Sequence, residues 1–345
     1  MKQVHNIRNC PGTLSAGYQT YSPTALRRMF GGRKVSHILD FTMKDKEHTL
    51  FDENIGRISI SGVQEKLSAI VYKGKVCLTP EGAQGYYVIK PAPEDKRLNH
   101  RYQMPANEHL TMQIARQVYG MSTAENAMIF FQDGEAAYIT KRFDVKADGS
   151  KIMQEDFASL SQKTSETHGK LFKYSGCYLD MGFLLQKYTA AWQIEVSKFL
   201  RMIVFNYLFA NGDAHLKNFS LQQSPNGDYI LSPAYDLLNS SLHIRDEDFA
   251  LEGGLFEKKN YSEIYQQKGH PCQDDFVEFG KKTGVPDIQI KKILTVFLRP
   301  QPLVYDLTER SFLNEKLKRM YIRSYEERLQ RLRRSSVYSV DIIKK

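Results

Sequence analysis

The sequence predicts an α+β protein built as two lobes, the first rich in strands and the second mostly helical. Short apolar runs separated by Gly and Pro fill residues 57–90, as in a sheet of short strands. Helical periodicity dominates after about residue 150. Because the chain has 345 residues, it is long enough for two domains or for one bilobed unit with a sizeable core.

The predicted β-rich lobe covers residues 49–144. Its expected strands are residues 57–61, 66–72, 76–78, 85–90 and 136–144. A tight turn at Lys73-Gly74-Lys75 and other short connections favour an antiparallel sheet. The preceding residues 1–48 give little structural signal beyond a short helix at 24–30.

Between these strands a helix is predicted at residues 107–119, with Gly120 as its stop. Glu108 is expected in the first turn of this helix, where the helix dipole favours a carboxylate. Lys90 ends the strand Val88-Ile89-Lys90. Two roles for Glu108 therefore stay open, the dipole role and an ion pair with Lys90.

The predicted helical lobe covers residues 145–345. Gln154, Glu155 and Asp156 indicate the start of a helix. Loops are expected at 161–176 and 239–260, which are rich in Gly, Ser and polar residues. Further helices are expected at residues 274–283, 287–298 and 311–333.

One polar stretch in this lobe contains the candidate catalytic and metal-binding residues. Asp213 is followed five residues later by Asn218, and after a short hairpin by Asp236. Protein kinases use this spacing: the first Asp takes the proton of the substrate hydroxyl, while the Asn and the later Asp hold Mg²⁺ on the nucleotide phosphates. Alone, Asn-Gly-Asp could be a helix C-cap and Asp236 a turn residue. The ordered combination instead predicts a phosphotransfer centre in a bilobed protein-kinase-like fold.

The surroundings of this stretch are predicted to be rigid. The nearly continuous apolar run at 199–209 indicates a buried helix that is stopped by Gly212. Downstream, apolar residues on either side of Asn226-Gly227-Asp228 predict a two-stranded hairpin. The catalytic loop is therefore expected to lie between a buried helix and a hairpin.

A second polar stretch, residues 59–66, lies between the first two predicted strands. It reads Ser-Ile-Ser-Gly-Val-Gln-Glu-Lys, and its small residues would let the backbone approach phosphates and offer N–H donors. The stretch matches neither GxGxxG nor the Walker pattern, so an ordinary hairpin turn is the alternative.

Most of the net positive charge lies near the C-terminus. The net charge is +9, and residues 310–345 carry eleven Lys and Arg against four Asp and Glu, which leaves only +2 for the other 309 residues. This basic region could meet nucleic acid or an acidic partner. The alternative is a solvated helix whose apolar residues pack inward, namely Leu317, Tyr321, Tyr325, Leu329 and Leu332.

Cysteine spacing and the distribution of apolar residues also indicate the cellular compartment. The four cysteines lie far apart without CxxC or Cys/His spacing, so reduced thiols are expected rather than a disulfide framework or a zinc site. The first eleven residues lack the apolar core of a signal peptide, and no stretch approaches the ~18 apolar residues of a membrane span. The sequence predicts a cytoplasmic protein without membrane contact.

With these motifs in order, the chain resembles the HipA family of bacterial toxin serine/threonine kinases from about residue 55 to 255. The matching motifs are Ser59-Ile60-Ser61-Gly62-Val63-Gln64-Glu65-Lys66, Lys90, Asn107-Glu108, Arg142-Phe143-Asp144, Gln154-Glu155-Asp156, Asp213 with His215, Lys217 and Asn218, and Tyr235-Asp236. Fewer residues precede the serine loop here than in full-length relatives. The chain is therefore most similar to the short HipT-type kinases of three-component toxin–antitoxin systems.

The resemblance implies a protein kinase that binds ATP and Mg²⁺ between its lobes, with Asp213 as the catalytic base and Asn218 and Asp236 on the metal. Lys141 and Phe143 would hold adenine through main-chain atoms. The residues implied to contact ATP are Ser61, Gly62, Val63, Gln64, Glu65, Lys66, Lys90, Lys141, Arg142, Phe143, His215, Lys217, Asn218, Tyr235 and Asp236.

The resemblance also implies regulation and partners. Family members autophosphorylate loop serines, here Ser59 and Ser61, and thereby lose activity. Active members target aminoacyl-tRNA synthetases. The implied partners are small HipS-like and HipB-like antitoxin proteins, with DNA contacted only through a helix-turn-helix partner.

Two other classes of function stay open. A small-molecule kinase of the aminoglycoside or choline type shares the Asp, Asn and later Asp, and phosphorylation of a metabolite but no protein would favour it. A non-catalytic antitoxin-binding or DNA-associated module would bind ATP without turnover. The intact set of acids, amide and lysine argues against the non-catalytic class.

Overall fold

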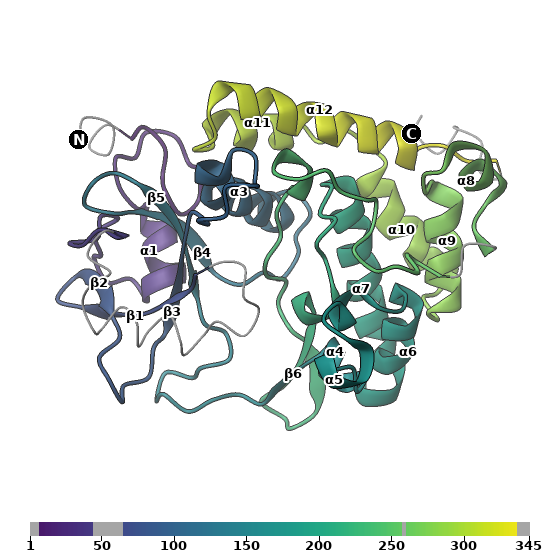
Figure 1. The fold of residues 1–345 in the computed structure, drawn as a ribbon, viewed down its shortest axis with the longest axis horizontal. Helices are drawn as coiled ribbons and strands as arrows, with labels where there is room; N and C mark the ends of the chain where they lie inside the picture. The colour runs from purple at the N-terminus through teal and green to yellow at the C-terminus, as the bar shows by residue number, and fades with distance from the viewer. Residues whose placement is uncertain (1–6, 44–64, 257–259, 337–345) are drawn as a thin grey trace. The chain divides into compact units, whose positions relative to one another are not determined.

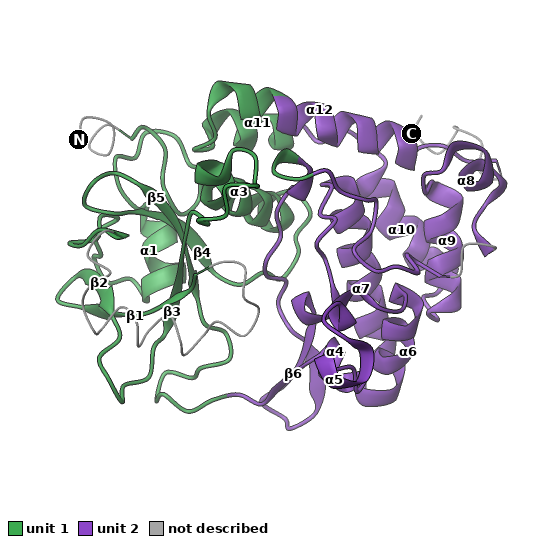
Figure 2. Cartoon of the chain, viewed as in Figure 1, with its two compact units in different colours: residues 1–151, 242–244, 303–319 green, residues 152–241, 245–302, 320–345 purple. Residues whose placement is uncertain are grey.

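The computed structural model describes residues 7–43, 65–256 and 260–336, and the chain forms two compact units (Figures 1 and 2). Unit 1 contains residues 1–151, 242–244 and 303–319. Unit 2 contains residues 152–241, 245–302 and 320–345. The chain thus returns to unit 1 twice after it first enters unit 2, and neither unit is one continuous stretch of sequence.

Unit 1 is built on a five-stranded antiparallel sheet in the order β2-β1-β3-β5-β4. Its strands are β1 (Leu67–Tyr72), β2 (Lys75–Leu78), β3 (Tyr87–Pro91), β4 (Asn126–Phe130) and β5 (Ala136–Lys141). Four of them confirm predicted strands, and the strand expected at 57–61 lies outside the described residues. β4 was missed because all five of its residues are buried and show no alternation.

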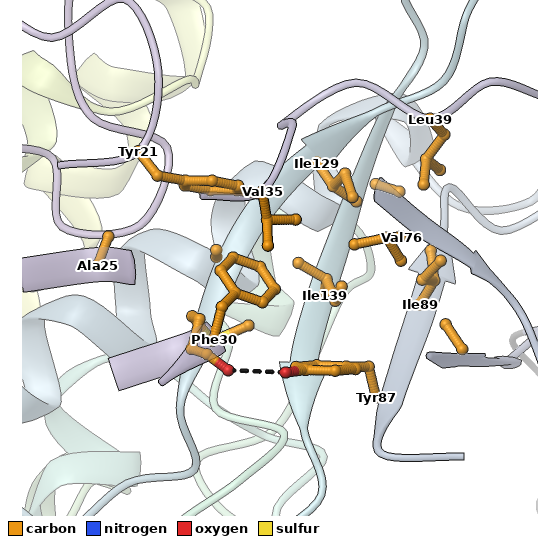
Figure 3. Close-up of a cluster of buried hydrophobic side chains, with 14 of the residues drawn as sticks. Tyr21, Ala25, Phe30, Val35, Leu39, Val76, Tyr87, Ile89, Ile129 and Ile139 are labelled. Atoms are coloured by element: carbon orange, nitrogen blue, oxygen red, sulfur yellow. Dashed lines mark hydrogen bonds between the residues drawn. The ribbon is translucent and has the colours of Figure 1, made fainter. Parts of the chain in front are cut away.

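The N-terminal segment, for which the sequence predicted little, completes the core of unit 1. α1 (Pro23–Phe30) begins at Ser22, whose hydroxyl accepts the N–H of Ala25 at 3.2 Å, as an N-cap residue does. Figure 3 shows side chains of this segment against the sheet, with the Tyr87 hydroxyl donating to the Met29 carbonyl at 2.9 Å. Burial of this apolar cluster attaches the segment to the sheet.

α3 (Met104–Gln117) is the helix predicted at 107–119, and it is preceded by the 3₁₀ turn η2 (Arg101–Gln103). It begins three residues earlier than predicted, and its first turn contains no acidic residue. Glu108 therefore lies in the second turn, and the helix-dipole interpretation of Glu108 is wrong. Unit 1 also contains nearly all of α11 (Pro302–Arg310).

Unit 2 is mostly helical, as predicted, and carries a small sheet in the order β6-β7-β8. Its elements are β6 (Gln154–Asp156), α4 (Phe157–Leu160), α5 (Ser165–His168), η3 (Phe172–Tyr174), α6 (Tyr178–Tyr188), α7 (Trp192–Leu208), η4 (Leu216–Asn218), β7 (Ser220–Gln223), β8 (Tyr229–Leu231), η5 (Ser240–Leu242), α8 (Glu263–Lys268), α9 (Gln273–Lys282) and α10 (Asp287–Phe297), with Leu242 of η5 counted in unit 1. The predicted hairpin is β7 and β8.

The residues Gln154–Asp156 form a strand rather than a helix start, because they pair with β7. The helix signal was partly right: the Asp156 carboxylate accepts the N–H of Ser159 at 2.9 Å and caps α4.

The C-terminal helix α12 (Glu315–Leu332) is the helix predicted at 311–333, and it contributes residues to both units. Much of its positive charge is paired: Arg328 and Arg331 contact Asp248, and Arg323 contacts Glu327. The five residues predicted to pack inward are all buried, namely Leu317, Tyr321, Tyr325, Leu329 and Leu332. The packing interpretation of this helix is therefore confirmed.

All four cysteines are free thiols, as their spacing predicted. Among the helices that the structure describes, none is both long and apolar enough to cross a membrane.

Candidate active site

Lys90, at the end of β3, forms a buried ion pair with Glu108 of α3. Its Nζ lies 2.7 Å from Glu108 Oε1, and the two side chains are 5% and 7% exposed. The ammonium also lies 5.4 Å from the centre of the Tyr138 ring, within range of a cation–π interaction. The ion pair left open by the sequence is present, and it fixes the position of a cation at the end of a central strand.

The residue before Glu108 extends this polar cluster. Asn107 Nδ2 donates to His243 Nε2 at 2.9 Å, while His243 Nδ1 donates to the Asn99 carbonyl at 2.8 Å. The two partners select this imidazole tautomer, and burial lowers the pKa of His243, which favours the neutral form. The sequence analysis did not identify His243, which lies 136 residues from Asn107 in the chain.

The predicted adenine contacts follow β5. The Lys141 N–H already donates to the Glu125 carbonyl at 2.8 Å, and the Arg142 N–H donates to the Tyr86 carbonyl at 2.9 Å. The Arg142 guanidinium pairs with Asp144. The Lys141 N–H is therefore not available to adenine. Of the predicted main-chain contacts to adenine, Lys141 can offer only its carbonyl oxygen.

The predicted phosphate loop lies largely outside the described residues. This applies to Ser59, Ser61, Gly62, Val63 and Gln64. Glu65 and Lys66 are described and directly precede β1.

In unit 2, the predicted buried helix is α7, and it leads into the loop that contains Asp213, the predicted catalytic residue. The helix ends at Leu208, and Ala210 has φ 50°, so the left-handed residue is Ala210 rather than Gly212. The Asn211 N–H then bonds back to the Asn206 carbonyl at 2.8 Å. This arrangement terminates the helix and fixes the backbone just before Asp213.

Glycine is required at position 212 by the close approach of Asp246, and not by the end of the helix. A Cβ atom at Gly212 would lie 2.3 to 2.5 Å from the Asp246 carboxylate. Ser240 joins the two, because its Oγ accepts the Gly212 N–H at 2.8 Å and donates to Asp246. Burial raises the pKa of Asp246. Neither Ser240 nor Asp246 is indicated by the sequence pattern, since both lie in a region without periodicity.

Asp213 accepts a hydrogen bond from the Tyr174 hydroxyl, with 2.8 Å between Oη and Oδ1. Burial raises the pKa of Asp213, and the nearby carboxylates of Asp246 and Asp236 act in the same direction. The Tyr174 hydrogen bond and the charge of Lys173 oppose this effect. A base with a raised pKa is better matched to proton transfer near neutral pH than an ordinary Asp.

His215 and Asn218 continue the loop beyond Asp213. The His215 N–H bonds to the Asp213 carbonyl at 2.8 Å, and the Asn218 N–H bonds to the His215 carbonyl at 2.9 Å. Burial lowers the pKa of His215 to about 3, so its imidazole is neutral at physiological pH. Its Nδ1 is buried and has no hydrogen-bond partner among the described residues, which leaves a polar atom free for a ligand.

Tyr235 and Asp236 follow the hairpin. The Tyr235 hydroxyl donates to the Lys217 carbonyl at 3.0 Å and contacts Ser220 Oγ, so it braces the loop from within. Asp236 adopts φ 55°, a left-handed conformation that is uncommon for a residue other than Gly. Because the Asp236 charge raises the pKa of Asp213, the two predicted acids lie in one electrostatic environment.

These donors fit Mg²⁺. Asn218 and Asp236 offer amide and carboxylate oxygens, the ligands that this hard cation prefers. The described residues contain no group of three or more His, Cys, Asp and Glu that could hold a metal on its own. Mg²⁺ in nucleotide enzymes is usually held by one or two protein groups together with substrate phosphates, so a complete protein cage is not needed.

Comparison with known proteins connects these geometries to a family. The profile of the "HipA-like C-terminal domain" matches residues 58–299, more than half of the chain. A Haemophilus influenzae protein named "Putative kinase" is 27% identical over 79% of this chain and 81% of its own length. The "Serine/threonine-protein kinase toxin HipA" of Shewanella oneidensis is 25% identical over 66% of this chain and 52% of its own length.

A solved structure supports the fold. The chain is similar to one from the Shewanella oneidensis HipA, HipB and operator DNA complex, with a TM-score of 0.58 and 21% identity. The similarity covers 84% of this chain and 67% of that chain. The α+β, kinase-like fold predicted from the sequence is therefore confirmed.

Proposed function

This chain belongs to the family defined by the HipA-like C-terminal domain, and from that premise we propose that it is an ATP-dependent serine/threonine protein kinase. The observation that carries the proposal is the loop after α7. There Asp213 is half-buried, accepts a hydrogen bond and has a raised pKa, and it shares its electrostatic environment with Asp236. A base and a metal-binding acid placed in this way suit phosphoryl transfer to a hydroxyl.

Each residue then has one task. Asp213 would accept the proton of the target hydroxyl as its oxygen bonds to the γ-phosphorus of ATP, while the bond from that phosphorus to the bridging oxygen breaks and ADP leaves. Lys90, held by Glu108, neutralises phosphate charge, and neutral His215 offers a nitrogen to the nucleotide. Mg²⁺, held by Asn218 and Asp236, would supply charge neutralisation on the phosphates. These electrostatic contributions are most of what phosphoryl transfer requires.

We assign the remaining predicted ATP contacts to the same reaction. Backbone N–H groups of residues 61–66 would cover the phosphates, and the carbonyl of Lys141 with the main chain of Phe143 would hold adenine. Lys217 would add positive charge near the phosphates. Tyr235 is better explained as a brace for the loop than as a direct ligand, because its hydroxyl is already bonded to Lys217 and Ser220.

The biological role follows from the family. We propose that the kinase is the toxin of a bacterial toxin–antitoxin system in the cytoplasm and that it phosphorylates an aminoacyl-tRNA synthetase. Its partners would be HipS-like and HipB-like antitoxins, with DNA bound only through the helix-turn-helix partner. The complex of HipA with HipB and operator DNA in Shewanella oneidensis supports this arrangement.

Ser59 and Ser61 are proposed autophosphorylation sites. A phosphoserine adds about −1.5 to −2 charge, which would repel the nucleotide phosphates and weaken ATP binding. Phosphopeptide mapping of wild-type and Asp213→Asn protein tests this step. Phosphate on either serine only in the wild type supports self-modification, and its absence from both serines contradicts it.

The central experiment is incubation of the purified protein with γ-labelled ATP and a cell lysate, followed by mass spectrometry of labelled proteins. We expect one dominant labelled protein with wild type and none with Asp213→Asn. A labelled metabolite without any labelled protein would instead show a small-molecule kinase. ATP binding without turnover would show a non-catalytic module.

A further inference from the structure

The segment 161–176, expected from sequence to be a plain loop, reaches Asp213. Within it, η3 (Phe172–Tyr174) places the Tyr174 hydroxyl 2.8 Å from Asp213 Oδ1. The two residues are 39 positions apart in the sequence. Among the described residues, this hydroxyl is the one side-chain hydrogen-bond donor to the Asp213 carboxylate.

We propose that Tyr174 is a positioning residue for the catalytic base: it occupies one carboxylate oxygen of Asp213 and directs the other toward the acceptor hydroxyl. This inference rests on the proposed kinase function. A carboxylate can rotate about its last bond, so a base that is bound through Oδ1 presents Oδ2 in one direction only. Holding the base in this way reduces the reorganisation needed at the moment of proton transfer.

Tyr174 is itself held firmly enough to do this. Its carbonyl accepts the Glu252 N–H at 2.9 Å, and two residues later the Gly176 carbonyl accepts the Gly253 N–H at 2.9 Å. Its ring meets the His215 imidazole edge-on, with 5.3 Å between centroids. The hydroxyl is therefore fixed both by the backbone of η3 and by a residue of the catalytic loop.

The hydrogen bond also affects the charge of the base. Tyr174 stays protonated, because burial and the charge of Asp213 raise the pKa of its phenol well above the ordinary value. As a neutral donor it lowers the pKa of Asp213, together with the charge of Lys173. Burial, Asp246 and Asp236 act in the opposite direction, and His215 nearby is neutral. Removal of the hydroxyl should therefore raise the pKa of Asp213 further.

Tyr174→Phe tests the inference, with Tyr207→Phe as the matched control. Tyr207 is also a tyrosine of unit 2 with a buried hydroxyl bond, but it donates to the Pro271 carbonyl at 2.8 Å. For Tyr174→Phe we expect kcat to fall about tenfold or more, the scale of one hydrogen bond to a charged group, with unchanged KM for ATP. The acid limb of the kcat profile should move to higher pH. Tyr207→Phe should leave the limb in place.

A direct titration separates this inference from the kinase assignment. The Asp213 carboxyl carbon, labelled with ¹³C and assigned by its loss in Asp213→Asn, is followed by NMR without nucleotide. A higher pKa in Tyr174→Phe than in wild type supports the contact even if the protein transfers no phosphate, and an equal pKa overturns it. Unchanged kcat with a lower KM for the protein substrate also overturns it, because Tyr174 would then compete with the acceptor hydroxyl.

Discussion

Lys90 in unit 1 is buried and Asp213 in unit 2 is half-buried, and the structure compensates these two ionisable groups in different ways. Lys90 has the opposite charge of Glu108 at 2.7 Å. Asp213 has the neutral hydroxyl of Tyr174 at 2.8 Å, and the acids Asp236 and Asp246 act against its ionisation.

This difference distinguishes a group that stays charged from a group that is suited to accept a proton. A full counter-charge holds a buried cation in its ionised state, which suits a group that neutralises phosphate. A neutral donor leaves the carboxylate ready to gain a proton, which suits a group that must change its protonation state during the reaction.

Breaking the pair in unit 1 should have the largest effect on stability. Glu108→Gln removes the negative charge that lies 2.7 Å from the buried Lys90 ammonium, which should lower the free energy of unfolding by about 3–5 kcal/mol. Replacing both partners by apolar residues, as in Lys90→Met with Glu108→Leu, should recover most of this loss. Urea denaturation measures each variant.

The matched control for this pair is Glu278→Gln, which breaks the more exposed Lys282–Glu278 pair at 3.1 Å. Its effect should stay within about 0.5 kcal/mol. Equal losses in Glu108→Gln and Glu278→Gln would show that the buried pair has no special role in stability.

Removing the base in unit 2 should affect catalysis instead. Asp213→Asn should reduce phosphotransfer by about 10²-fold or more, the usual contribution of a general base, and Asp236→Asn should also abolish activity by removing a metal ligand. Both variants should remain folded by circular dichroism. Asp133→Asn, in the turn between β4 and β5 of unit 1, is the control, and wild-type rates in both site variants would contradict the assignment.

The sequence predicted those parts of the site that lie close together in the chain. Asp213, His215, Lys217 and Asn218 fall within six residues, and their order after an apolar helix carries the signal. The strand that contains Lys90 was predicted for the same reason, because a short apolar run closed by Pro91 is a local pattern.

The residues that the sequence did not predict come from segments that are distant in the chain. Tyr174 is 39 residues from Asp213, Ser240 is 28 residues from Gly212, and His243 is 136 residues from Asn107. All three lie in segments expected to be loops, where no periodicity indicates which side chain points inward. Only tertiary packing brings these residues to their partners, so a single sequence offered no basis for identifying them.

Ser240→Ala tests whether Ser240 positions Asp213 through the backbone of Gly212. Ser240→Ala removes the acceptor of the buried Gly212 N–H and a donor to Asp246, so the free energy of unfolding should fall by about 1–3 kcal/mol. The rate of phosphotransfer should fall as well, because Gly212 directly precedes Asp213. Ser241→Ala, at an exposed neighbour whose hydroxyl contacts Asn239 at 2.6 Å, is the control. Equal effects of the two variants would contradict this role.

The smallest expected effect is a pH-dependent gain in stability when the base is neutralised. The folded protein raises the pKa of Asp213 above its unfolded value, so between these two values the folded state binds more protons than the unfolded state. Stability from this group is fully present below the unfolded pKa, near the ordinary value of about 3.9, and is lost as pH rises through the folded pKa.

Asparagine carries no charge to bury, so Asp213→Asn should be more stable than wild type at pH 7. The difference should shrink as the pH is lowered toward 4, because wild-type Asp213 then becomes protonated. Thermal unfolding of both proteins from pH 4 to pH 8 measures the difference, and Asp133→Asn should show no comparable trend. A difference that is constant across this range would mean that the Tyr174 hydrogen bond and Lys173 fully offset burial and the neighbouring acids.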